Sequence, residues 1–340
     1  MNEPRTSLKR WFPGGSLIWP LIGLAILLIF NLIYTPTLFR LQILNGHLYG
    51  SLVDILNQGS RVMLLSIGMT LVIACGGVDL SVGSVMAISG AIAAMLVTTS
   101  KLPFGAVIIC ALAVSTVAGL CNGYLVARAG IQPIIATLIL MVAGRGVAML
   151  ITHGQIITFE HAGFVFFGNG HFLGFPFTVT VVALVFALTA LATRKTAIGL
   201  FLESVGDNET AARFCGINSA FVKWVVYGFS GFCAGIAGLL ATSNIKAADS
   251  SRVGEMMELD AIFAVVVGGT ALTGGRLSLL GSIVGALLIQ TLTTTLYNLG
   301  VPPAVAPVPK AILVVCVCLL QSPKFRAEIL SLFPRKRRPA

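Results

Sequence analysis

Long apolar runs, separated by short polar or glycine- and proline-containing stretches, occupy most of this chain of 340 residues. A helix needs about 20 mostly apolar residues to cross the hydrocarbon core of a bilayer. Ten runs come close to that length, so we predict about ten membrane-spanning helices. They cover residues 17–36, 60–76, 82–99, 104–127, 132–152, 176–193, 219–241, 259–272, 279–298 and 304–321.

The composition supports this interpretation. Hydrophobic residues make up 56% of the chain and charged residues only 10%, whereas about 25% of a soluble domain is charged. The first apolar run follows Lys9 and Arg10 as a signal peptide would, but it has the length of a full span and no small-residue cleavage site at its end. We therefore expect an all-α polytopic membrane protein that retains its first span.

Lysine and arginine predict the orientation, because basic residues are retained on the cytoplasmic side. With the N-terminus inside, ten crossings place fifteen of the 22 basic residues in the cytoplasm and four outside. Both termini are then cytoplasmic: a tail at 1–16, a transmembrane domain at 17–322 and a basic tail at 323–340. The net charge of +10 fits this topology and contact with anionic lipid. No basic domain with aromatic platforms is present, so nucleic acid is not an expected partner.

Cysteine and histidine give no sign of a metal site. The seven cysteines and four histidines lack the spacing of metal ligands or of a disulfide framework. We expect the cysteines to be small apolar core residues, and we expect no metal and no cofactor in this chain.

One polar stretch, residues 194–218, stands out between the apolar runs. Ser204 or Asp207 can cap a short helix there, and Gly216 can end it in the left-handed conformation. The segment could be an amphipathic connector on the membrane surface, but only Phe214 offers a bulky apolar anchor. We favour a docking element that a partner protein grips, with charged residues setting the register.

The same stretch resembles the cytoplasmic coupling loop of bacterial ABC sugar-importer permeases of the ribose, xylose, arabinose and galactofuranose type. Three further motifs are similar to that family and occur in the same order: GGVDLSVGSVMAISGA at 76–91, NGYLVARAGIQPIIATL at 122–138 and LDAIFAVVVGGTALTGGR at 259–276. The resemblance assigns ATPase coupling to Glu203, Gly206, Asp207, Asn208, Ala211, Ala212, Arg213 and Gly216.

The resemblance implies that the chain works with partners in the bacterial inner membrane: a separate ATPase subunit, an extracytoplasmic sugar-binding protein and a second permease subunit, identical or related. The chain itself has no GxxxxGK[ST] run, so we expect a non-catalytic subunit. The run at 138–159, with Arg145-Gly146 and Gly154-Gln155, is most similar to the galactofuranose-importer permease. Ribose or another pentose or hexose is the alternative substrate.

Charged and polar residues within the apolar runs are candidates for the sugar path, because such groups in a membrane are costly. Asp79 either caps the following helix, which we favour, or lines the path or an inner gate. Arg145 either forms an ion pair with Asp54, Asp79 or Asp260 or donates to sugar hydroxyls. The full set of candidates is Asp79, Ser81, Asn122, Gln132, Thr137, Arg145, Gln155 and Asp260.

Two further expectations concern the whole chain. Asp79-Leu80 and Leu259-Asp260 stand beside similar glycine-rich apolar runs, which suggests two pseudo-repeated halves. The competing function is a secondary transporter driven by protons or sodium, with Asp79 or Asp260 as the coupling carboxylate. An intramembrane enzyme ranks far lower, because no span carries a catalytic arrangement of side chains.

Overall fold

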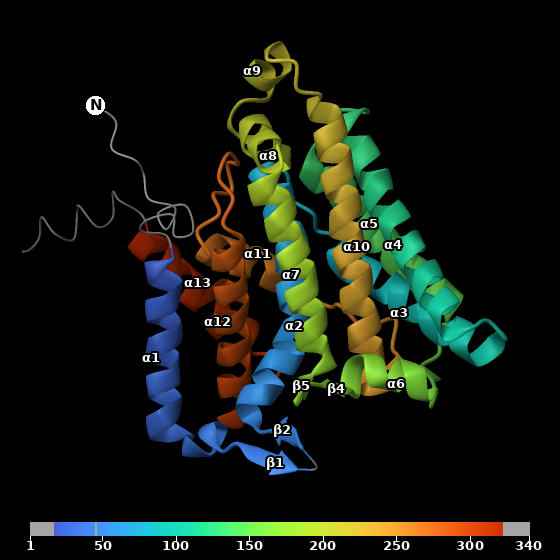
Figure 1. Ribbon diagram of the computed structural model, residues 1–340, viewed down its shortest axis with the longest axis vertical. Helices are drawn as coiled ribbons and strands as arrows, with labels where there is room; N and C mark the ends of the chain where they lie inside the picture. Colours follow the sequence, from blue (N-terminus) through green and yellow to red (C-terminus); the bar gives the residue numbers. More distant parts are fainter. Residues whose placement is uncertain (1–16, 45, 322–340) are drawn as a thin grey trace, which may run out of the picture.

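The computed structural model describes residues 17–44 and 46–321 as a tall helical bundle (Figure 1). The predicted tails at 1–16 and 323–340 lie outside these residues. The helices are α1 (Ile18–Tyr34), η2 (Pro36–Phe39), α2 (Ser51–Ala74), α3 (Val82–Thr99), α4 (Phe104–Ala127), α5 (Pro133–Ile151), α6 (Ala162–Asn169), α7 (Phe177–Lys195), α8 (Ile198–Asp207), α9 (Glu209–Phe214), α10 (Ser219–Ile245), α11 (Met257–Val267), α12 (Leu279–Asn298) and α13 (Pro307–Gln321).

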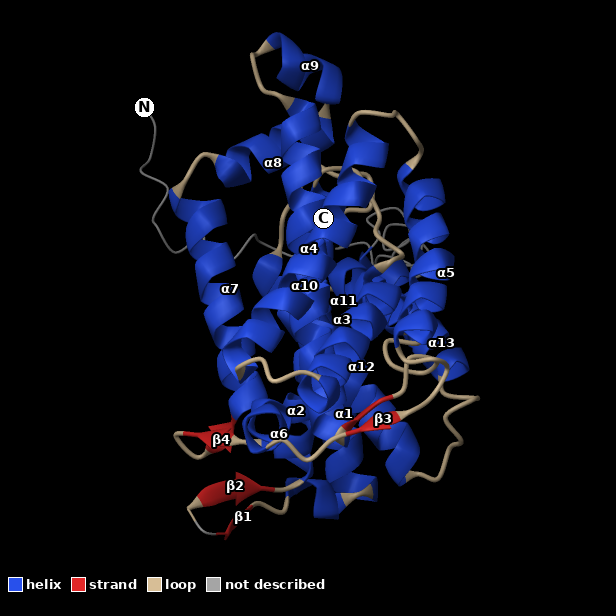
Figure 2. Ribbon diagram, turned by 90° about the vertical axis from the view of Figure 1, so that its right-hand side faces the viewer, coloured by secondary structure: helices blue, strands red, loops and turns tan. Residues whose placement is uncertain are grey.

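Within the described residues, three short two-stranded antiparallel ribbons accompany the helices. They pair β1 (Gln42–Leu44) with β2 (His47–Tyr49), β3 (Ile157–Thr158) with β6 (Ala247–Ala248), and β4 (His171–Phe172) with β5 (Phe175–Pro176). Figure 2 shows them at the end of the bundle opposite α9. The expectation of an all-helical membrane protein thus holds for the bundle, and the strands are confined to the connections at one end.

Seven helices in the described part of the chain are long and apolar enough to cross a membrane: α2, α3, α4, α5, α7, α10 and α12. The apolar helices α1 and α13 are shorter, with 17 and 15 residues. A polytopic membrane protein is therefore supported, but the expected ten spans are not all full-length. The clearest departure is α11, whose 11 residues rise about 16 Å, roughly half of the hydrocarbon core.

The spanning helices form an inner and an outer group. Most of the apolar stretch is buried in α2 and α10, 78% and 83%, but only 22% in α4 and α5. Small residues allow the inner packing: a methyl group at Gly231 of α10 would overlap the Ser115 carbonyl of α4, and one at Gly238 would overlap the Met86 backbone of α3. The small-residue spacing on α10 therefore serves packing within the chain.

Non-helical backbone on both sides explains why α11 is short: segment 246–256 precedes the helix, and Gly269 follows it with a φ angle of 90°. Lys246, Gly254 and Met256 have positive φ angles of 56°, 75° and 61°, which a helix cannot contain. Gly254 packs directly on Gly83 of α3, and a methyl group on either glycine would overlap the other's carbonyl oxygen. Non-helical backbone at membrane depth requires burial in protein, and this glycine contact supplies it. The apolar run at 259–272 is therefore a half-length helix.

Candidate functional site

The predicted coupling loop forms two short helices, α8 and α9, at one end of the bundle (Figure 1). Asn208 separates them, and its side-chain oxygen accepts from the N–H of Ala211 at 2.9 Å. The expectation that Ser204 or Asp207 caps this helix was wrong, because the chain turns one residue later. Gly216 ends α9 with φ +84°, as expected from the need for a left-handed residue.

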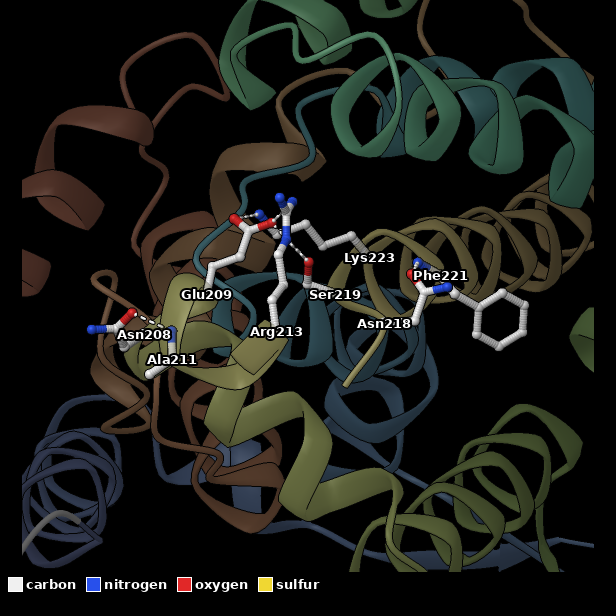
Figure 3. Close-up of polar contacts among 8 residues, drawn as sticks. All are labelled: Asn208, Glu209, Ala211, Arg213, Asn218, Ser219, Phe221 and Lys223. Atoms are coloured by element: carbon white, nitrogen blue, oxygen red, sulfur yellow. Dashed lines mark hydrogen bonds and ion pairs between the residues drawn. The ribbon is translucent and has the colours of Figure 1, made fainter. Parts of the chain in front are cut away.

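A compact charged cluster ties α9 to the first turns of α10 (Figure 3). The Glu209 carboxylate contacts Arg213 at 2.6 Å through one oxygen and Lys223 at 2.5 Å through the other. Ser219 donates to Glu209 at 3.0 Å and accepts from Arg213 Nε at 2.7 Å. Sequence reasoning missed Glu209, Ser219 and Lys223, although the spacing of Glu209 and Arg213, four residues apart, is the usual helical ion-pair spacing.

The same contacts set the ionisation of Glu209. Partial burial raises the pKa of this carboxyl, but the hydrogen bonds and charges from Lys223, Ser219 and Arg213 outweigh it and hold the pKa below its ordinary value. Glu209 is therefore ionised at neutral pH, and α9 is held to α10 by charge-assisted hydrogen bonds.

The outward face of α9 differs from the predicted one. Ala211 is exposed, as expected for a docking surface, but Ala212 is 4% exposed and packs inside the chain. Phe214, considered in the sequence only as a lipid anchor, is 89% exposed. An aromatic side chain presented in this way, on a helix held by ion pairs, is the kind of residue that anchors a protein interface.

Helix α8 connects this surface to the bundle interior. A methyl group at Gly206 would overlap the carbonyl oxygen of Ala74, at the end of α2, and the N–H of Gly275 donates to that same oxygen at 3.0 Å. Glu203 accepts from the N–H of Leu277 at 3.3 Å. Gly206 and Glu203 thus join α8 to α2 and to the connection between α11 and α12, while Asp207 is exposed.

Three of the predicted path residues meet at the break between α2 and α3. Asp79 accepts from the N–H and the hydroxyl of Ser81 at 3.0 and 2.6 Å and from Ser230 of α10 at 2.8 Å. Asn122 of α4 donates to Ser81 at 2.9 Å. Asp79 is 1% exposed. The network joins α3, α4 and α10, and Ser230 is a member that the sequence did not indicate.

Thr137 lies beside this network. It donates to the carbonyl of Pro133 at 2.9 Å, within its own helix, and lies 3.5 Å from the carbonyl oxygen of Val78. The hydroxyl of Tyr227 donates to that same Val78 oxygen at 3.2 Å. The Val78 carbonyl freed by the helix break is thus satisfied by the Tyr227 side chain of α10, as a break within a membrane requires.

The other charged candidates lie apart from the network. Arg145 donates to the carbonyl oxygens of Ser250 and Val253, at 3.1 and 2.5 Å, so its partners are the non-helical backbone before α11 and none of the three expected aspartates. Asp260 forms an ion pair at 2.8 Å with Lys310 of α13. Gln132 and Gln155 are exposed, at opposite ends of α5.

The fold and the polar groups define a polytopic membrane permease: buried helices joined by internal hydrogen bonds, and an ion-paired helical projection at one end. Residues 51–318 match the family described as branched-chain amino acid transport system / permease component. The chain belongs to this family.

Characterised relatives match nearly the whole chain. The galactofuranose transporter permease protein of Escherichia coli (strain K12) is 48% identical over 94% of both chains. The fructose import permease protein of Bifidobacterium longum (strain NCC 2705) is 40% identical over 92% of this chain and 89% of its own. The ribose import permease protein of Escherichia coli (strain K12) is 35% identical over 95% of this chain and 100% of its own.

Proposed function

We propose that this chain is the membrane-spanning subunit of an ATP-driven importer that carries a monosaccharide, galactofuranose, across the bacterial inner membrane. The observation that carries the proposal is the ion-paired α8–α9 unit with Phe214 exposed at its end. A separate ATPase subunit binds this unit on the cytoplasmic side, and an extracytoplasmic sugar-binding protein delivers the substrate to the opposite end. A second permease subunit completes the path.

The contacts of the unit support a mechanical role. A force applied to α9 reaches α10 through Glu209 and Lys223, and a force applied to α8 reaches α2 through the contact of Gly206 with Ala74. Both α2 and α10 are central, buried helices. ATP-driven closure of the ATPase subunits would therefore move α2, which ends shortly before Asp79, and α10, which carries Ser230 of the Asp79 network, and so open and close the sugar path by rigid-body rocking.

The choice of sugar rests on the 48% identical galactofuranose permease, with the fructose and ribose relatives as the alternatives. Uptake of labelled galactofuranose by vesicles that contain the complete importer tests it. Unlabelled galactofuranose should compete strongly, and ribose and fructose weakly. Competition by ribose or fructose at lower concentrations would reassign the substrate.

The docking role is tested by Phe214→Ala, with Leu173→Ala as the matched control. Both residues are large, apolar and almost fully exposed, 89% and 86%, but Leu173 lies in the turn between β4 and β5, at the opposite end. We expect Phe214→Ala to weaken co-purification of the ATPase subunit at least tenfold, as loss of an aromatic anchor does, and Leu173→Ala to leave it unchanged. If both variants retained the ATPase subunit equally well, the docking role of Phe214 would be contradicted.

A further inference from the structure

A second site lies beside the α8–α9 unit, where α4 ends and α10 begins. A cavity of about 320 Å³ opens there at the surface of the bundle. The residues that line it are Ala127, Arg128, Arg213, Asn218, Ser219 and Ala220. Figure 3 shows Arg213, Ser219 and Asn218 along the path from α9 to α10. Two arginines, Arg128 and Arg213, line this one cavity, and guanidinium groups bind phosphate through paired N–H donors.

The charges around this cavity do not balance. Glu209 is the carboxylate of the adjoining cluster, and it is shared between Arg213 and Lys223. Arg128 is exposed and has no carboxylate partner within residues 17–44 and 46–321. The negative end of the α4 dipole is offset by the positive end of the α10 dipole at the same place. The cavity therefore carries excess positive charge that an anionic group would neutralise.

The surroundings of the cavity indicate where the anion comes from. Tyr124 and Phe221 are 58% and 57% exposed, and Trp224 is 37% exposed, with its indole N–H donating to the carbonyl of Leu120 at 3.1 Å. Exposed tyrosine and tryptophan are typical of the headgroup level of a bilayer. The cavity thus opens at the depth where lipid phosphates lie.

The surface of α4 continues from this cavity towards the membrane interior as an apolar stripe. Val117, Cys121 and Tyr124 are exposed on the same helical face as Arg128, because their spacing of three or four residues places them one above another. An acyl chain can lie along this stripe while the headgroup occupies the cavity.

We propose that the cavity binds the phosphate headgroup of an anionic phospholipid, with Arg128 and Arg213 as its ligands and the acyl chains along α4. Because Arg213 also pairs with Glu209, the bound phosphate and Glu209 share one guanidinium. The lipid therefore adjusts how firmly α9 is held to α10. Transport activity should accordingly depend on anionic lipid.

The test compares Arg128→Gln with Lys195→Gln, which removes the same charge from an exposed position at the end of α7. The full-length chain is placed in nanodiscs of phosphatidylcholine with increasing phosphatidylglycerol, and retained phosphatidylglycerol is counted by native mass spectrometry. A basic residue near an anionic surface contributes about 1 kcal/mol. We therefore expect Arg128→Gln to lower the preference for phosphatidylglycerol about fivefold. Arg128→Lys should lower it by an intermediate amount, because the charge stays but the paired donors are lost, and Lys195→Gln should lower it less than twofold, because Lys195 does not line the cavity.

Three results would overturn the proposal. The first is equal phosphatidylglycerol preference in Arg128→Gln and Lys195→Gln. The second is displacement of the lipid by excess inorganic phosphate, which would make this a free-phosphate site. The third is loss of ATPase-subunit association by Arg128→Gln in pure phosphatidylcholine with lipid preference unchanged, which would assign the cavity to an acidic side chain of the partner. Phe214→Ala should leave the lipid preference unaltered, so this test is independent of the docking role.

Discussion

Asp79 shows how a carboxylate in a membrane can serve structure. Its two oxygens accept three hydrogen bonds, from the N–H and hydroxyl of Ser81 and from the hydroxyl of Ser230. The sequence, Asp-Leu-Ser before an apolar run, suggested that Asp79 caps the following helix; Asp79 lies two residues before the N-cap Ser81 and accepts from the N–H of Ser81 itself. The sequence could not indicate Ser230, which is 151 residues away, because only the packing of α10 against α3 brings the two together.

Substitution of Asp79 separates the structural role from a carboxylate role in ion coupling. Asp79→Ala leaves buried donors without a partner, at about 1–3 kcal/mol each, and should lower the unfolding midpoint in detergent. Asp79→Asn keeps an acceptor for Ser81 and offers a donor to Ser230, so we expect a smaller loss of stability and uptake within about twofold of wild type. Abolished uptake with an unchanged unfolding midpoint in Asp79→Asn would contradict the structural role.

Glu209 predicts a pH dependence at the docking surface. A carboxyl whose folded pKa lies below its ordinary value contributes stability that is fully present above about pH 4.5 and is lost as the pH falls through the folded value. Because Glu209 is partly exposed, the contribution is about 1 kcal/mol or less. The backbone amides of residues 209–216 should therefore become a few-fold less protected against hydrogen exchange at acidic pH, once the rates are corrected for the intrinsic effect of pH.

Glu209→Gln provides the control for this pH dependence. Its protection should be reduced at neutral pH and should no longer change through the acidic range, because the titrating group is gone. Protection equal to wild type at neutral pH would show that the cluster does not hold α9.

At the scale of elements, the long apolar helices were predictable and the helix breaks were not. Uniform apolar runs gave α3, α4, α7 and α12 nearly as predicted. The run at 259–272 is equally apolar, but α11 ends at Val267, before Gly269 with its positive φ. Before α11, the contact of Gly254 with Gly83 and the bonds from Arg145 to the Ser250 and Val253 carbonyls stabilise a non-helical entry. Such tertiary contacts leave no periodic signal, so both the shortness of α11 and the role of Arg145 were missed.

Two glycines of the α8–α9 unit make a matched pair for the next prediction. Gly206→Ala should disrupt the unit, because the new methyl group would overlap the Ala74 carbonyl. At Gly216 an added methyl group would have no atom within 4 Å. Gly216→Ala is therefore disfavoured only by the positive φ of 84° at this position, which costs an alanine roughly 1 kcal/mol. We expect Gly206→Ala to lower the unfolding midpoint and ATPase association far more than Gly216→Ala. Similar effects would show that the α8–α2 contact is unimportant.

At the scale of the whole molecule, composition predicted a polytopic membrane protein and the motifs predicted the permease family, and both are confirmed. The expected docking surface for the ATPase stays a prediction, but the structure separates its residues into exposed ones and ones packed inside the chain. Ala211, Arg213 and Asp207 are exposed, whereas Gly206 and Ala212 face the chain itself. A linear sequence could not separate these groups, since α8 and α9 meet at an angle set by Asn208.

The central claim is that this permease moves sugar only when a separate ATPase drives it. Proteoliposomes that contain the chain with its ATPase subunit and sugar-binding protein should take up labelled galactofuranose when ATP is present, and an uncoupler should not change the rate. Vesicles with the chain alone should show no uphill uptake. Uphill uptake by the chain alone that collapses with the uncoupler would contradict the account and identify a proton-driven transporter.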